Sequence, residues 1–457
     1  MPEAYLTAAG AHLPGPPVSN AEMVGHIGLL DDRSEALGRL ALRQNRIASR
    51  HYALGTDGTV SASNAEMAAL AVADAVAKSE RALREIDLLA AATTQGDLLV
   101  PGHASQVQAA LGIGPLELVS VQSVCAGALI AAKAAALQVM ADGKRAAAVV
   151  GSEFSSRWFQ PGFYPQTALV DQGHRAALEF LRWTLSDGAG AILIEPRPNE
   201  RRQSFKIEWI KLVSLAHAFP PCMAAGTVPS HRTERDGGWS HRPQAALAEG
   251  ALVLWQDMVL LKRIIRAWVG EYLKLVDAGL IVPERIDWLL CHYSAENLRQ
   301  EIVSILTATG GMIDEEKWFT NLHSKGNTGA AALFVMLDEF VERGLARPGQ
   351  QVLCIVPESG RANSGGVDPA TGGKAAQQIM GSSDDVCGNL LGASRGERTR
   401  GSARQWRGGH GDFLRFERVR GVPRSGGRDI GLIGIAGCEM AERGHHIITV
   451  VAANGAE

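Results

Sequence analysis

One cysteine lies where the backbone can activate a thiol. Cys125 sits in residues 121–129 (VQSVCAGAL), after a strand-like segment and directly before an alanine-rich helix expected to begin at Ala126. At a helix N-terminus, unpaired backbone N–H groups and the positive end of the helix dipole favour the thiolate. The small residues Ala126 and Gly127 also leave room for a carbonyl substrate. The context predicts a nucleophilic thiol, and a small buried hydrophobe is the alternative interpretation.

Two further polar residues occupy similar junctions. His292 directly follows the apolar segment 288–291, so it should lie at the carboxyl end of a strand, where α/β sheets place their chemistry. Asn327 begins a small-residue helix in the string HSKGNTGAAA. Taken alone, His292 is typical of a hydrogen-bonded structural residue and Asn327 of a helix cap. Together with Cys125 they form a set of three polar groups that is more specific than any one of them.

The elements that must position these residues alternate between strands and helices. Short apolar runs predict buried strands at residues 87–94, 146–153, 189–195, 287–294 and 351–358. Amphipathic segments predict helices at residues 63–85, 126–142, 252–278 and 327–343. This alternation predicts a layered α/β architecture. The strands at 87–94 and 287–294 each open with an Ile-Asp pair after a helix, which indicates a weak internal duplication.

Composition limits the class of protein. The chain has 457 residues, 46% of them hydrophobic, and a formal net charge of −3. This balance disfavours both a disordered chain and one that binds nucleic acid or an anionic membrane. There is no long apolar run and no secretory signal, so we expect a cytoplasmic protein without a membrane partner. The six cysteines form no CxxC pair, and no phosphate loop or nucleotide fingerprint stands out, so we expect neither a metal nor a cofactor.

The character of the sequence changes near residue 367. Ten arginines fall between residues 395 and 428 among many glycines, and no lysine follows Lys374. Three interpretations stay open: a flexible solvated tail, an out-of-frame or divergent remnant of a longer ancestor, and, least favoured, a Gly/Arg segment that binds RNA. The strand-like residues 447–452 could still dock on the body of the protein.

Several motifs in a fixed order give the chain a family resemblance. Cys125, His292 and Asn327, in this order, resemble the catalytic set of the thiolase superfamily, specifically of β-ketoacyl-acyl-carrier-protein synthase III. The resemblance spans roughly residues 5–366. It includes the opening GAHLPGPPVSNAEM and the strings RQNRIASRHYA, ATTQGDLLVPGHASQVQAALGI, VQSVCAGAL, SDGAGAILIE, CHYSAENLR and KGNTGAA.

The resemblance implies a five-layered α-β-α-β-α fold of two pseudo-symmetric halves, usually as a homodimer. The nucleophile half would cover residues 1–200 and the half with His292 and Asn327 residues 201–366. Residues 367–457 would form an irregular C-terminal tail. This picture also accounts for the weak duplication.

The resemblance also implies a role for each site residue. Cys125 would accept an acyl group from a thioester, while His292 and Asn327 would hydrogen-bond the carbonyl of a malonyl extender as carbon dioxide leaves. The N–H of Cys125, with one from the loop near Ser359 and Gly360, would form the oxyanion hole. Asparagine in the third position favours decarboxylative Claisen condensation over the chemistry of thiolases or hydroxymethylglutaryl-CoA synthase. Arg299 keeps the basic position that helps to dock an acyl carrier protein.

Departures from the family pattern limit the range of substrates that we expect. The tryptophan that stacks on CoA is missing from ALRQNR, HYSAEN replaces the family's HQAN, and PESGRANSGG replaces a run of glycines. These changes resemble members that serve secondary, polyketide-like metabolism, with acyl or malonyl thioesters of carrier protein or CoA as substrates. An acyltransferase that forms an ester or amide on the same fold is the alternative. A non-catalytic partner subunit of another synthase is a third hypothesis, which the three retained polar residues disfavour.

Overall fold

The computed structural model describes residues 2–165, 172–228, 238–360 and 446–454. The described residues belong to one compact unit. The hypotheses for the Gly/Arg-rich tail fall on residues outside the described part, except for a strand at 446–454. The predicted division at residues 200 and 366 therefore stays a prediction, with one strand from the end of the chain added to the body.

The first half contains five strands in the order β5-β4-β6-β7-β1. β4, β5 and β6 run parallel, and β7 is antiparallel to both β6 and β1. The bounds are β1 Tyr5–His12, β4 Leu88–Thr93, β5 Glu117–Gln122, β6 Ala147–Glu153 and β7 Gly188–Glu195. Its main helices are α3 (Asn64–Ser79), α4 (His103–Leu111) and α5 (Gly127–Asp142).

The second half repeats this arrangement as β12-β11-β13-β14-β8. Its bounds are β8 Phe205–Ser214, β11 Trp288–Cys291, β12 Trp318–Phe319, β13 Gln351–Val356 and β14 His446–Asn454, with helices α9 (Met258–Asp277), α10 (Glu296–Thr309) and α12 (Ala332–Glu342). A short β1–β8 pairing joins the halves into one run of ten strands. Smaller elements are α1 Met23–Ile27, α2 Ser34–Asn45, α6 Gln172–Arg182, α8 Pro243–Ala248, α11 Leu322–Lys325, β2 Val18–Ser19, β3 Ser49–Arg50, β9 Met223–Ala224 and β10 Trp255–Gln256.

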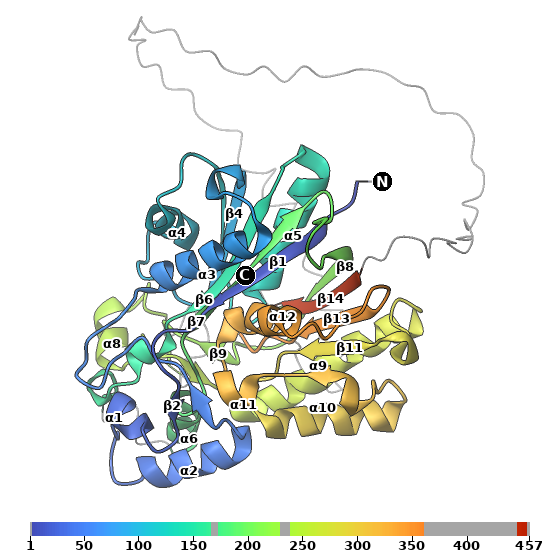
Figure 1. The fold of residues 1–457 in the computed structure, drawn as a ribbon. Coiled ribbons are helices and arrows are strands. Elements are labelled where there is room, and N and C mark those ends of the chain that lie inside the picture. Colours follow the sequence, from blue (N-terminus) through green and yellow to red (C-terminus); the bar gives the residue numbers. More distant parts are fainter. Residues whose placement is uncertain (1, 166–171, 229–237, 361–445, 455–457) are drawn as a thin grey trace, which may run out of the picture. The chain divides into compact units, whose positions relative to one another are not determined.

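Three hydrophobic cores define the layers. One core packs α3 and α4 against the outer face of the first-half strands. A second packs the central helices α5 and α12 between the two groups of strands, with residues from β4, β6, β11 and β13. The third packs α9 and α10 against the second-half strands. Helix, sheet, helix, sheet and helix therefore follow one another, as expected for the five-layered fold (Figure 1).

Local signals explain where two of these helices begin. Ser63 and Glu66 form a reciprocal capping box at the start of α3. Asp257 accepts hydrogen bonds from the backbone N–H groups of Val259 and Leu260, which starts α9 at Met258. The predicted helix at 252–278 was therefore six residues too long at its start. Trp255, predicted to lie on that buried helix, belongs instead to the short strand β10.

The last strand departs from the internal symmetry. In the first half, β7 is antiparallel to its neighbours β6 and β1. The strand in the corresponding place, β14, is parallel to both β13 and β8, between which it lies (Figure 1). It is central in the sheet, and backbone hydrogen bonds of β13 and β8 depend on it.

Proline within β14 is expected to destabilise the protein. Val450 pairs with Cys354 on one side and Ile210 on the other, and proline removes its N–H and fits poorly in a central strand. We expect Val450→Pro to lower the free energy of unfolding by about 1–3 kcal/mol, the cost of leaving a buried backbone group without its hydrogen-bond partner. Val450→Ala, which keeps the N–H, is the control. Equal urea-unfolding midpoints for the two variants would contradict the pairing of β14.

Candidate active site

One cavity collects the three predicted site residues. Cys125, His292 and Asn327 all line it, although they lie far apart in the sequence. Most of its polar residues follow the carboxyl ends of parallel strands: Thr94 and Gln95 after β4, Cys125 after β5, Glu153 at the end of β6, His292 after β11 and Ser359 after β13. This is the sheet edge at which α/β proteins bind ligands. The remaining wall is largely apolar and includes Phe154, Phe159, Leu181, Met223, Ile265, Trp268, Leu298 and Ile302.

Cys125 stands at the predicted turn, but its protonation differs from the expectation. It is 8% exposed and immediately precedes Ala126, the N-cap residue of α5. Burial, followed by the negative charges of Glu358 and Glu153, raises the pKa of the Cys125 thiol well above its usual range. The expectation that the helix N-terminus would favour the thiolate was therefore wrong for the substrate-free chain. Desolvation and two carboxylates outweigh the half charge of a helix end.

His292 is placed by the pairing of β11 with β13. Its backbone N–H donates to the carbonyl of Ile355 at 2.8 Å, which fixes the residue just beyond the end of β11. The side chain is buried, and burial lowers its pKa to about 4. At neutral pH the imidazole is therefore uncharged, and it can donate one hydrogen bond and accept another.

The buried His292 makes stability depend on pH. Its pKa falls from 6.5 to about 4 on folding, so the unfolded chain binds the proton more readily between these values. His292 therefore costs stability as pH falls below 6.5, by about 2 kcal/mol at pH 5 relative to pH 7. We expect His292→Gln to lose this part of the acid destabilisation in urea unfolding at the two pH values. An identical pH dependence for wild type and variant would contradict the neutral imidazole.

Asn327 belongs to the second half but is held by the first. It forms a bridge with Leu185, and its carbonyl accepts the N–H of Ser186 at 2.8 Å. Its side-chain Oδ1 accepts the N–H of Gly329 at 3.0 Å. This contact assigns the amide orientation, so the Nδ2 end is the part that can donate to a substrate.

Gly151 of β6 allows the two halves to approach each other closely. A Cβ at this position would lie 2.5 Å from the carbonyl oxygen of Ala330, so a larger residue would push the loop after Asn327 away. Glycine is the residue that permits such contact between backbones. Gly151 thus lets Asn327 approach the side of the cavity that carries Cys125.

Glu153 is a cavity residue that the sequence analysis did not identify. Its carboxylate accepts hydrogen bonds from Thr94 Oγ1 at 2.6 Å, Thr94 N at 3.1 Å and Ala330 N at 3.3 Å. Burial raises its pKa to about 7 despite these bonds. Glu153 therefore joins the strand ends of the first half to the Asn327 loop and can exchange a proton near neutrality. Its place at the last position of a predicted strand was the available signal.

The loop after β13 also contributes a carboxylate that sequence reasoning missed. Glu358 is 1% exposed; it is the last residue of the predicted strand 351–358, but it lies in the loop that follows the end of β13 at Val356. The carbonyl of Gly360 accepts hydrogen bonds from the N–H groups of Cys222 and Met223, at 2.8 and 3.2 Å. This anchors the loop beside the cavity, while the predicted oxyanion-hole role of Cys125 and Gly360 stays a prediction.

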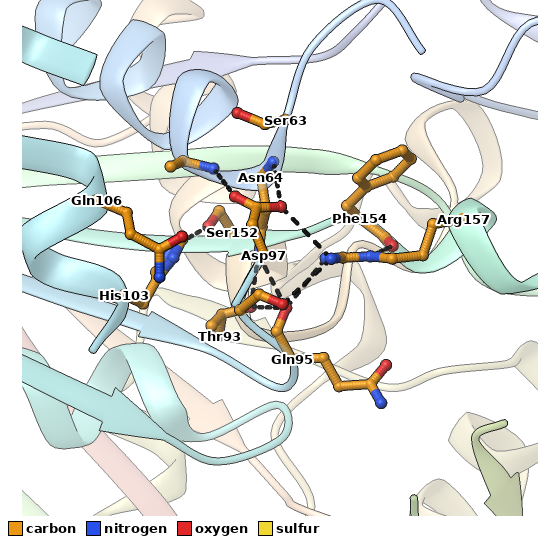
Figure 2. A network of polar contacts seen from close by, with 12 residues as sticks. Ser63, Asn64, Thr93, Gln95, Asp97, His103, Gln106, Ser152, Phe154 and Arg157 are labelled. Carbon is orange, nitrogen blue, oxygen red and sulfur yellow. Dashed lines mark hydrogen bonds and ion pairs between the residues drawn. The ribbon is translucent and has the colours of Figure 1, made fainter. Parts of the chain in front are cut away.

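A polar network supports the cavity wall around Gln95 and Arg157 (Figure 2). Arg157 donates to the carbonyls of Phe154 at 2.7 Å and Gln95 at 3.0 Å, and it pairs with Asp97 at 3.4 Å. Asp97 in turn accepts the N–H groups of Asn64 and Ala65 at the start of α3. Arg157 therefore braces the loop after β4, and its donors serve the protein's own carbonyls.

Arg299, predicted to dock a carrier protein, lies among internal partners. Its side chain is 15% exposed and pairs with Glu315 at 2.7 Å and Glu296 at 3.4 Å. Its guanidinium also lies 4.9 Å from the centre of the Trp318 ring. These contacts use much of its hydrogen-bonding capacity, and its role in docking stays a prediction.

Two further polar residues near the site, His323 and Cys222, do not line the cavity. His323 contacts the carbonyl of Arg46 at 2.8 Å, which is a structural contact. Cys222 is fully buried, whereas its neighbour Met223 lines the cavity. Cys125, Cys291 and Cys354 are free thiols. Within the described ranges, no group of three His, Cys, Asp or Glu side chains could hold a metal, and no helix is long and apolar enough to cross a membrane.

Known proteins resemble this chain in sequence and in fold. Residues 277–361 match the family model 3-oxoacyl-[acyl-carrier-protein (ACP)] synthase III C terminal. Beta-ketoacyl-[acyl-carrier-protein] synthase III of Hyphomonas neptunium is 26% identical over 355 residues, covering 76% of this chain and 93% of that protein. The Caulobacter vibrioides enzyme of the same name is 26% identical over 348 residues, covering 76% and 94%.

Solved structures share the fold at lower identity. FabH from Pseudomonas aeruginosa PAO1, a 3-oxoacyl-(acyl carrier protein) synthase III, has a TM-score of 0.56 at 17% identity and covers 78% of this chain and 95% of its own. The tetronic acid condensing enzyme AbyA1 has a TM-score of 0.57 at 20% identity, with coverage of 78% and 97%. The chain is a divergent thiolase-superfamily protein of the β-ketoacyl-acyl-carrier-protein synthase III type. The predicted family and the five-layered fold of this synthase III-like protein are thereby confirmed.

Proposed function

We propose that this protein is a decarboxylating β-ketoacyl synthase, an acyltransferase that forms a carbon–carbon bond. The observation that carries the proposal is the single cavity lined by Cys125, His292 and Asn327. A thiol, a neutral imidazole and an amide around one apolar cavity suit acyl transfer followed by stabilisation of an enolate. The similarity to β-ketoacyl-[acyl-carrier-protein] synthase III of two bacteria supports the same reaction class.

In the first step, Cys125 takes the acyl group. Its sulfur attacks the thioester carbonyl, the bond from that carbonyl to the donor sulfur breaks, and the thiol proton leaves for the departing thiolate. The N–H of Cys125 lies close to its own sulfur, where it also favours the thiolate, and it can donate to the oxyanion. Gly360 would supply the second donor from the loop after β13.

In the second step, a malonyl thioester loses carbon dioxide. Negative charge develops on its thioester oxygen, which His292 and the Nδ2 end of Asn327 stabilise by hydrogen bonds. The neutral His292 suits this role because it needs no proton from solvent at pH 7. The enolate carbon then attacks the acyl carbonyl on Cys125 and the bond from that carbonyl to the Cys125 sulfur breaks. This forms the β-ketoacyl product and a Cys125 thiolate, which takes a proton from solvent to return the thiol.

The substrates we propose are acyl and malonyl thioesters carried by acyl carrier protein, with CoA thioesters as the alternative donor. The apolar cavity wall favours an aliphatic or aromatic acyl group over a polar one. The pathway would belong to fatty-acid-related or polyketide-like metabolism, because known relatives include both kinds of condensing enzyme. No cofactor is needed for either step, and a cytoplasmic location would give access to these carriers.

An acyltransferase without carbon–carbon bond formation is the second candidate. In that reaction an oxygen or nitrogen nucleophile would receive the acyl group from Cys125. Release of carbon dioxide from a malonyl thioester separates the two, because only the condensing enzyme requires it. A non-catalytic partner subunit, the third hypothesis, would acquire no acyl group at Cys125, whether a malonyl thioester or an oxygen or nitrogen nucleophile is the acceptor.

We also propose that the protein is a homodimer paired along β5. This strand is the outer edge of the ten-stranded sheet, and its residues alternate between exposed and half-buried. Nearby, Leu99 and Val100 are 83% and 81% exposed, an unusual exposure for adjacent apolar residues. We expect Leu118→Lys, on the β5 edge, to shift the mass measured by light scattering towards the monomer. An unchanged dimer in this variant, or a monomeric wild type, would contradict pairing through this edge.

A further inference from the structure

Glu358 contacts the nucleophile turn on both sides of Cys125. Its carboxylate oxygens accept hydrogen bonds from Ser123 Oγ at 2.9 and 2.8 Å. One of them, Oε2, also accepts the backbone N–H of Ala126 at 3.1 Å. Ser123 and Ala126 flank Cys125 in the sequence, so one buried side chain grips the turn that presents the thiol.

The loop that carries Glu358 is itself fixed. Gly360 accepts two backbone hydrogen bonds from residues 222 and 223, and a Cβ on Gly360 would lie 3.0 Å from Glu358 Oε1. The loop backbone therefore passes close against the carboxylate. The Ala126 N–H, which a helix N-terminus would offer to a nearby anion, is already bound to a carboxylate.

Other ionisable groups also face the thiol. Glu153 approaches from the end of β6, and His292 from the end of β11 is uncharged at neutral pH. Glu358 raises the pKa of Cys125 more than Glu153 does. Its hydrogen bonds and its larger effect on the pKa of Cys125 thus distinguish Glu358, in the loop after β13, from Glu153 and His292.

We propose that Glu358 is a positioning residue that holds the Cys125 turn and keeps the resting nucleophile as a neutral thiol. The carboxylate occupies the N-terminal end of α5 and places negative charge where thiolate charge would otherwise be stabilised. The nucleophile is then unreactive towards general electrophiles until a substrate enters the cavity. This inference rests on the proposed nucleophilic role of Cys125, but its test requires no thioester.

The test is the pH profile of Cys125 alkylation by iodoacetamide in the full-length protein, followed by peptide mass spectrometry to separate Cys125 from the other cysteines. Glu358→Gln removes the charge and keeps one oxygen that can accept a hydrogen bond from Ser123 or Ala126, while an NH2 group takes the place of the other oxygen. We expect the profile midpoint to fall by at least one pH unit. Because a less basic thiolate is also less nucleophilic, each unit should raise the rate at pH 7.5 about threefold.

Two further variants and the wild type serve as comparisons for Glu358→Gln. Glu153→Gln should shift the midpoint in the same direction but by less. Glu195→Gln, a buried carboxylate on β7 that contacts Thr7 and Arg81, should leave the profile unchanged. A folded Glu358→Gln protein with the wild-type profile would overturn the proposal. A wild-type midpoint below the usual thiol value of about 8.5 would overturn it even if that variant failed to fold.

A separate measurement distinguishes failure of this inference from failure of the proposed function. If Cys125 shows the expected alkylation profile but forms no adduct with any acyl thioester, the electrostatic role of Glu358 stands and the proposed reaction fails. If acyl adducts form on Cys125 while the alkylation profile of Glu358→Gln equals that of wild type, the proposed reaction stands and the electrostatic role of Glu358 fails.

Discussion

Replacing Cys125 with alanine is expected to abolish acyl transfer. The variant lacks the sulfur that would carry the acyl group, and among the described cavity residues it has no other cysteine to replace it. We expect no acyl adduct by intact mass after incubation with acyl thioesters, and a loss of condensation of at least about 10³-fold. Alanine fits a site that is already closely packed, so the fold should remain intact.

The matched control is Cys354→Ala. Cys354 is also a fully buried thiol, but it lies within β13 and does not line the cavity. This variant should retain the adduct at wild-type stoichiometry, with a cost only in stability. Persistence of an adduct in Cys125→Ala would show that another nucleophile carries the acyl group.

Replacing either His292 or Asn327 with alanine is expected to separate the two steps. Each variant should still acylate Cys125 but lose decarboxylation of the malonyl thioester. Removing one preorganised donor from a developing oxyanion typically costs about 10²- to 10³-fold in rate. The measurement is carbon dioxide release from labelled malonyl thioester, alongside intact mass for the acyl adduct.

His323→Ala provides the comparison for the histidine. His323 contacts Arg46 outside the cavity, so its loss should leave carbon dioxide release near the wild-type rate. Wild-type malonyl turnover in His292→Ala or Asn327→Ala would refute the roles assigned to them. Loss of the acyl adduct in those variants would place them in the first step instead.

The sequence predicted the parts of the fold that have strong local signals. The strands β4, β6, β7 and β13 were located to within two residues at either end, since each is a buried apolar run bounded by turn residues. The helix after Cys125 begins at Gly127, one residue after its expected start at Ala126, which is its N-cap. The family motifs then gave the order of the elements and the two halves, which periodicity alone would have left open.

Other elements carry weaker signals. β5 is exposed at its edge, β8 is largely half-buried and β12 is only two residues long, so none shows the apolar run of a central strand. The direction of β14 also could not be predicted, because it depends on pairing with β13 and β8 and not on its own composition.

The site residues also divide into those with a recognisable sequence signal and those without one. The three residues with recognisable motifs line one cavity, whereas Glu153 and Glu358 were missed because a single carboxylate at a strand end has no characteristic spacing. Burial of the thiol, followed by the charges of these two carboxylates, then reversed the expected protonation of Cys125. Local sequence predicted the helix dipole correctly, but the thiol pKa depends on groups more than 20 residues away along the chain.

The central claim, decarboxylative condensation on Cys125, is tested most directly by a single-turnover experiment. Protein already acylated on Cys125 is mixed with a malonyl thioester of acyl carrier protein, and carbon dioxide, the acyl adduct and the product are followed together. We predict that one carbon dioxide is released for each adduct lost, with a β-ketoacyl thioester as the product. Loss of the adduct to an alcohol or amine without carbon dioxide, or an adduct that persists unchanged, would contradict the account.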